Sequence, residues 1–249
     1  MYRIHQIKLK LGESTDCLPQ KILKLIGNRE LLISEWHIVK ESIDARDKKH
    51  IRLVYSVDFT AVYKKNPKKQ ARLAANPKLK LEEAPNLAYV PAVYEGEACA
   101  SKDENRAKET LPSARVLRDR PIIVGFGPAG MFAALILAQA GLRPLVLERG
   151  QEVDARTASV ERFWREGTLN EQSNVQFGEG GAGTFSDGKL TTGIKDARIR
   201  KVLEEFVAAG APKEILYKQK PHIGTDVLRL VVKNIREEIK RLGGEVRFN

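Results

Sequence analysis

The sequence has little cysteine or histidine, and this scarcity excludes several kinds of site. Its 249 residues include two cysteines, Cys17 and Cys99, which are too few for a disulfide framework and too far apart for a CxxC redox pair. The histidines are scattered without the spacing of metal ligands, at His5, His37, His50 and His222. We therefore expect neither a disulfide-stabilised fold nor a metal site.

A long apolar run is also missing. The longest uninterrupted apolar stretch, residues 131–138, has eight residues, whereas a bilayer-spanning helix needs ~18 or more. The N-terminus alternates polar and apolar residues and lacks the continuous apolar core of a signal peptide. These absences predict a cytoplasmic protein with no membrane partner.

Acidic residues are absent from one strongly basic segment. The formal net charge is +11, and seven of the Lys and Arg residues lie in segment 64–80, which contains no Asp or Glu. Such a block attracts phosphate backbones or acidic partners, although a solvated linker or helix face has the same composition. No aromatic residue is interleaved with these lysines to stack on single-stranded bases. We expect no nucleic-acid partner, and keep nucleic-acid or acidic-partner binding as the alternative function.

Hydrophobic periodicity divides the chain into two domains and a linker. Residues 1–100 predict a β-α-β-β order, typical of a small ferredoxin-like α+β domain, with a short helix near residues 68–75 of its basic segment. Residues 101–119, punctuated by charge and proline, are assigned to the linker. In residues 120–249, short apolar strands alternate with helices, which predicts an α/β domain.

The run Gly125-Phe126-Gly127-Pro128-Ala129-Gly130 matches a dinucleotide-binding fingerprint in its context as well as in its letters. A buried strand is expected just before it, at residues 122–124, and an uncharged helix follows it directly. Glu148 ends the next predicted strand, where an acid is expected to bind a ribose diol. The charge of Glu148 would repel a 2′-phosphate, which disfavours NADP at this site.

Each glycine of this motif has a physical role. Gly125 permits the tight turn from strand to helix, and Gly127 lets the backbone approach a pyrophosphate without a Cβ atom in the way. Gly130 allows the helix to pack closely against the strands. The first-turn amides and the helix dipole would then face the phosphates.

A second glycine-rich run, residues 178–183, matches the same letters in a different context. The residues before it are polar and those after it predict a turn, so it is not a second dinucleotide fold. Its glycines indicate a close approach of backbone to a ligand or to another segment. Asp187 and Lys189, in the polar loop that follows, are candidates for a catalytic acid or base, but no catalytic residue is assigned.

Several long strings resemble a known group of proteins. The string VGFGPAGMFAALILAQAGLRPLVLERG resembles the N-terminal fingerprint of the glutathione-reductase-like flavoproteins. The strings SNVQFGEGGAGTFSDGKLTTGIKD and KPHIGTDVLRLVVKNIREEIKRLGGEV resemble the bacterial FAD-dependent dehydrogenases described as NAD(FAD)-utilising, and ESIDARDKKHIRLVYSV fits their small leading domain. The resemblance covers nearly the whole chain.

This resemblance implies an FAD-dependent oxidoreductase with a Rossmann-like FAD/NAD(P)-binding domain, with NAD(P)H as electron donor and an unknown small-molecule substrate or redox partner. It assigns the pyrophosphate to Gly125, Gly127, Pro128, Ala129 and Gly130, and the adenosine ribose to Glu148. It places a further set of residues along the cofactor toward the flavin, namely Arg149, Gly180, Gly181, Ala182, Gly183 and Thr184. A dehydrogenase that uses NAD alone fits less well, because of the Pro-Ala pair inside the motif and the long glycine loop.

One feature of the family is missing from the sequence. These flavoproteins close the FAD site with a later strand that ends in Gly-Asp, and this chain contains no Gly-Asp dipeptide. The last residues, 245–248, predict a further strand in which the sequence stops. The resemblance therefore implies an incomplete FAD-binding domain and an N-terminal portion of the enzyme.

Overall fold

The computed structural model describes residues 1–73, 79–86, 89, 119–186, 188–194 and 196–248, which belong to two compact units. The first unit comprises Met1–Leu87 with Leu216–Pro221, and the second comprises Ala88–Ile215 with His222–Asn249. Apart from Asp119, the predicted linker lies outside the described residues. The sequence pattern does not predict that residues 216–221 group with the first unit.

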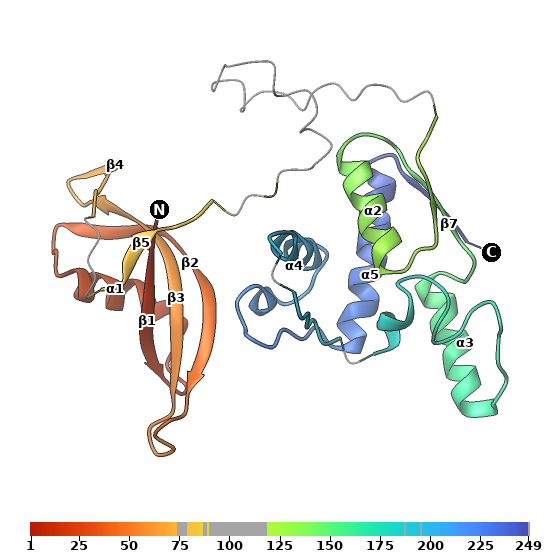
Figure 1. Ribbon diagram of the computed structural model, residues 1–249, viewed down its shortest axis with the longest axis horizontal. Coiled ribbons are helices and arrows are strands. Elements are labelled where there is room, and N and C mark those ends of the chain that lie inside the picture. The colour runs from red at the N-terminus through yellow and green to blue at the C-terminus, as the bar shows by residue number, and fades with distance from the viewer. Residues whose placement is uncertain (74–78, 87–88, 90–118, 187, 195, 249) are drawn as a thin grey trace. The chain divides into compact units, whose positions relative to one another are not determined.

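In its described residues, the first unit is an antiparallel sheet with one α-helix (Figure 1). Its elements are β1 (Tyr2–Lys10), a 3₁₀ turn (Thr15–Cys17), α1 (Leu18–Ile26), β2 (Leu31–Asp44), β3 (Arg52–Tyr63), β4 (Asn66–Gln70) and β5 (Leu81–Glu83). The sheet order is β2-β3-β1-β5, so the two strands that α1 connects flank β3. The predicted β-α-β-β order is therefore present, while the ferredoxin-like assignment stays a prediction.

The buried side chains of this unit explain why its elements form. Leu18 and Ile22 lie one turn apart on α1 and are fully buried, and Gly27 ends the helix at a φ of 72°. On β3, Tyr55, Val57 and Phe59 alternate toward the same core.

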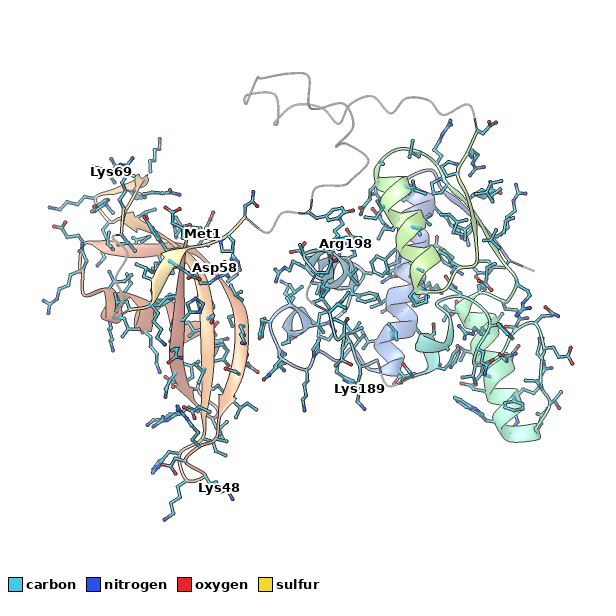
Figure 2. All side chains as sticks on the ribbon, viewed as in Figure 1. Met1, Lys48, Asp58, Lys69, Lys189 and Arg198 are labelled. Atoms are coloured by element: carbon cyan, nitrogen blue, oxygen red, sulfur yellow. The ribbon has the colours of Figure 1, made fainter. Side chains whose placement is uncertain are left out.

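The predicted helix near residues 68–75 is wrong over its described part, because Asn66–Gln70 is a strand paired with β3. Every residue of β4 is exposed, and the strand contains Pro67 as well as lysines. Proline and lysine on an edge strand prevent pairing with other chains. Figure 2 shows Lys69 on this strand and Lys48 at the far end of the β2–β3 hairpin.

The second unit contains a three-stranded parallel sheet with strand order β6-β7-β8. The elements that the sequence predicts are β6 (Ile122–Val124), α2 (Pro128–Gln139), β7 (Leu145–Glu148), α4 (Arg198–Ala208), α5 (Thr225–Arg241) and β8 (Glu245–Phe248). Those that it does not predict are α3 (Val153–Glu166) and two 3₁₀ turns (Ala182–Phe185 and Lys213–Leu216). This unit is mixed α/β, and its Rossmann-like FAD assignment stays a prediction.

One face of the parallel sheet is covered by helices. The apolar sides of α2 and α5 share a core with Val146 of β7, and Figure 1 shows the two helices next to each other. On the other face, Ile122 and Val124 are 64% and 86% exposed. No described helix is both long and apolar enough to cross a membrane.

Candidate functional site

The turn between β6 and α2 has the geometry that the glycine motif predicts. Gly125 adopts a φ of 92°, and its amide donates to the carbonyl of Leu147, 2.8 Å away, which extends the pairing of β6 with β7. Gly127 is the N-cap of α2, and Pro128 is the first residue of the helix. The first turn contains no acidic residue, so its positive dipole end has no negative side chain beside it in sequence.

Gly130 and Gly127 lack a side chain for different reasons. A Cβ atom built on Gly130 would lie 2.0 Å from the carbonyl oxygen of Gly125, so helix and strand pack too closely for any side chain. A Cβ atom on Gly127 would meet no described protein atom within 4 Å, and its φ of −72° is open to every residue type. Protein packing therefore explains the glycine at position 130 but not the glycine at position 127.

Glu148 is largely buried and holds the same turn in place. One of its carboxylate oxygens accepts from the amide of Phe126 at 2.6 Å, and the other accepts from the amide of Gly150 at 2.7 Å. Its exposed fraction is only 9%. A carboxylate has about four acceptor positions, so two bonds do not exhaust it. The ribose role predicted for Glu148 is thus accompanied by a structural role that the sequence does not predict.

The second glycine run lies against the first. The amide of Gly180 donates to the carbonyl of Phe126 at 2.8 Å, and a Cβ atom on Gly181 would lie 3.1 Å from the ring of Pro128. Gly178 packs against Gly150 of the loop after β7. The structure therefore brings together the two glycine segments, which are about fifty residues apart in the sequence.

The remaining predicted residues of this loop differ in accessibility. Ala182 and Gly183 are exposed in the Ala182–Phe185 turn, and a Cβ atom on Gly183 would meet nothing within 4 Å. Thr184 is buried, and its hydroxyl donates to the carbonyl of Glu179 at 3.1 Å. Its side chain therefore supports the loop from inside.

Arg156 of α3 is fully buried. It anchors the loop that contains the second glycine run (the second loop, residues 174–183) by binding main-chain carbonyls of that loop. Its guanidinium donates to the carbonyls of Asn174, Val175 and Glu179 at 2.9, 3.0 and 2.5 Å. Burial lowers the pKa of Arg156 to about 10, so the group remains charged at neutral pH. Sequence reasoning missed this residue because α3 has few apolar positions and its periodicity is weak.

Glu179, between two glycines of the loop, is also fully buried. One oxygen accepts from the amide of Val153 at 2.7 Å and from Arg236 of α5 at 3.0 Å. Its other oxygen has no hydrogen-bond partner among the described residues. Burial raises the pKa of Glu179 to about 7, although the Val153 amide and the charge of Arg236 lower it.

This buried carboxyl predicts a pH-dependent stability. As the pH rises from about 4.5 to about 7, the unfolded chain releases the Glu179 proton while the folded chain keeps it. The free energy of unfolding should therefore fall by roughly 2–3 kcal/mol over this range and stay lower above it. Glu179→Gln should remove this fall, as measured by urea unfolding at pH 5 and pH 8. Glu161→Gln, at an exposed position of α3, is the control, and a Glu179→Gln profile parallel to wild type would contradict the prediction.

The structure describes one of the two candidates for acid–base chemistry, Lys189. Asp187 lies outside the described residues. Lys189 forms an isolated antiparallel bridge with His222 and lines, with Leu203 and Phe206 among others, a mainly apolar cavity of about 430 Å³. Figure 2 labels Lys189 and Arg198, which both line this cavity. The described residues include no cluster of potential metal ligands.

Two known sequences or families are similar to parts of this chain or to nearly all of it. Residues 1–60 match a family described as a domain of unknown function, DUF8436. An uncharacterized protein of Clostridium beijerinckii (strain ATCC 51743 / NCIMB 8052) is 49% identical over 247 residues, which cover 99% of this chain and 42% of the relative. The chain thus spans less than half the length of this relative. Neither match carries functional information.

Proposed function

We propose that the second unit binds the ADP portion of FAD and that the protein is an FAD-dependent oxidoreductase. The observation that carries the proposal is the meeting of two glycine segments at the N-terminus of α2, through the Gly180–Phe126 hydrogen bond and the Gly181–Pro128 contact. Backbone that converges on a helix N-terminus offers N–H groups and a positive dipole end to an anion.

The residues present fit a pyrophosphate. The first turn of an α-helix leaves amides without partners inside the helix, and those of Ala129 and Gly130 stand in this position in α2. Gly127 has open space where a Cβ atom would be, which protein packing does not explain. A phosphate group close to the backbone accounts for both features.

The proposal assigns a role to each predicted site residue. The pyrophosphate would be held by Gly125, Gly127, Pro128, Ala129 and Gly130. Glu148 would accept from the adenosine ribose with its remaining acceptor positions, and its charge disfavours a 2′-phosphate. The second loop, with Gly180, Gly181, Ala182 and Gly183, would line the path toward the flavin, with Thr184 supporting that loop from below. Arg149, which directly follows Glu148, would contact the cofactor on its adenosine side.

FAD, when bound, would supply hydride or electron transfer, and NAD(P)H is the proposed donor. This chain's own residues would bind and orient the cofactor, while the substrate or redox partner is of unknown identity. The lysines of β4 lie on an exposed edge strand, where they keep the sheet edge from associating. Protection of the sheet edge explains the lysines of β4 without a nucleic-acid partner.

Glu148→Ala tests the proposal. Loss of a charged hydrogen-bond partner should weaken ADP binding by about 1.5–3 kcal/mol, or roughly ten- to a hundred-fold, as measured by calorimetric titration. Glu148→Gln should also weaken binding, because its NH₂ group would face one of the two backbone donors at Phe126 and Gly150.

Controls separate the ribose contact from loop support. Inorganic pyrophosphate should bind Glu148→Ala nearly as well as wild type if the loss is the ribose contact, and much more weakly if the loop is disordered. Glu171→Ala, at an exposed acid of the same unit, should leave ADP binding unchanged. Equal ADP affinity in wild type and both Glu148 variants would place the ribose elsewhere.

A further inference from the structure

Phe177 is an exposed aromatic residue on a turn whose backbone is held firmly. Its side chain is 40% exposed. The amide of Asn174 donates to the carbonyl of Phe177 at 3.2 Å, and the Asn174 side chain accepts from the amides of Gln176 and Phe177 at 2.9 and 3.3 Å. Exposed turns are usually polar and poorly anchored, so a fixed turn that presents a phenyl ring to solvent points to a ligand.

Buried residues beneath the turn fix it further. Arg156 binds the carbonyls of Asn174 and Val175 from below. Gly178, directly after the ring, has a φ of 119°, and a Cβ atom there would lie 2.5 Å from the Arg156 side chain. The backbone that carries the ring is therefore held by buried contacts.

The guanidinium of Arg149 lies over this ring. The guanidinium carbon is 4.0 Å from the centroid of Phe177, and the Arg149 side chain is itself exposed. Arg149 directly follows Glu148, and the Gly150–Gly178 contact fixes the two loops to each other. An arginine stacked on an aromatic ring offers a planar cationic surface, which suits the face of a heteroaromatic base.

We propose that the Arg149–Phe177 stack is the surface on which the adenine base of the nucleotide stacks. This inference rests on the proposed function, since it needs the ribose at Glu148. It makes Phe177, which comes from the second loop, a determinant of base recognition, while the glycine motif binds only the phosphates.

The test compares ADP with inorganic pyrophosphate, which has no base. Phe177→Leu keeps an apolar side chain but removes the ring, and it should weaken ADP binding about tenfold while leaving pyrophosphate binding unchanged. Phe177→Tyr keeps the ring and should bind ADP as wild type does. Calorimetry provides the affinities, and circular dichroism checks that each variant is folded.

The possible outcomes distinguish this inference from the proposed function. If Glu148→Ala weakens ADP binding and Phe177→Leu does not, the base lies elsewhere and only the inference fails. If Phe177→Leu weakens ADP and pyrophosphate equally, Phe177 merely supports the loop, and the inference also fails. If wild type binds neither ADP nor pyrophosphate, the proposed function itself fails.

Discussion

Gly127→Val is expected to abolish FAD retention in a protein that still folds. The backbone at Gly127 is extended, with φ −72° and ψ −178°, so valine fits without strain. The new Cβ atom would meet no described protein atom within 4 Å, but it would occupy the proposed path of the pyrophosphate. We expect at least about a hundredfold loss of affinity, equivalent to ~2.7 kcal/mol, measured as flavin absorbance per folded protein.

A second glycine provides the matched control. Gly193 also has no atom within 4 Å of a built Cβ atom, and it lies outside the glycine loops. Gly193→Val should retain flavin as wild type does. A folded Gly127→Val protein with normal flavin content would show that the pyrophosphate does not pass this residue.

Gly130→Ala is expected to cause a large loss of stability, whereas Gly127→Val is expected to lose flavin and still fold. The added methyl group would lie 2.0 Å from the Gly125 oxygen and 3.3 Å from the Ile123 side chain. Because the Gly125 oxygen belongs to the backbone, α2 has to move, and we expect about 3 kcal/mol of destabilisation in urea unfolding. In an uncrowded helix the same substitution stabilises by roughly 0.5–1 kcal/mol. The sign of the change in the free energy of unfolding therefore also tests the close packing at Gly130.

Gly127→Ala, three residues earlier, isolates the effect of packing. It should change the free energy of unfolding by less than about 1 kcal/mol, since nothing surrounds the new methyl group. Equal stability of the two alanine variants would mean that helix and strand are not in close contact at Gly130.

The strands and helices of the second unit could be predicted largely because their signals are local. The strand at Ile122–Val124 and the uncharged helix after it are recognised by short continuous apolar runs, and α5 by its helical period. Thr225 begins α5 after the N-cap Gly224, and its hydroxyl donates to the carbonyl of Ser186. A distant backbone acceptor decides that bond, and no local pattern reveals it.

The parts that escaped prediction depend on contacts between distant segments. The prediction of a helix at residues 68–75 is wrong over its described part because Asn66–Gln70 pairs with β3, and such pairing overrides local propensity. At the candidate site, the turn at Gly125 and the start of a helix after Gly127 could be predicted, but not the meeting of the two glycine runs. The hydrogen bonds of Arg156 and Arg236 to Glu179 join three segments that only the fold brings together.

The anchoring of the second loop by Arg156 constrains how its sequence can change. Every hydrogen bond from this guanidinium goes to a main-chain carbonyl, at Asn174, Val175 and Glu179. Carbonyls are the same whatever side chain follows, whereas the donors of a guanidinium have a fixed planar geometry. The loop is therefore tolerant of substitution at Val175 but intolerant of insertion or deletion between positions 174 and 179. Its length, more than its composition, is what the buried arginine requires.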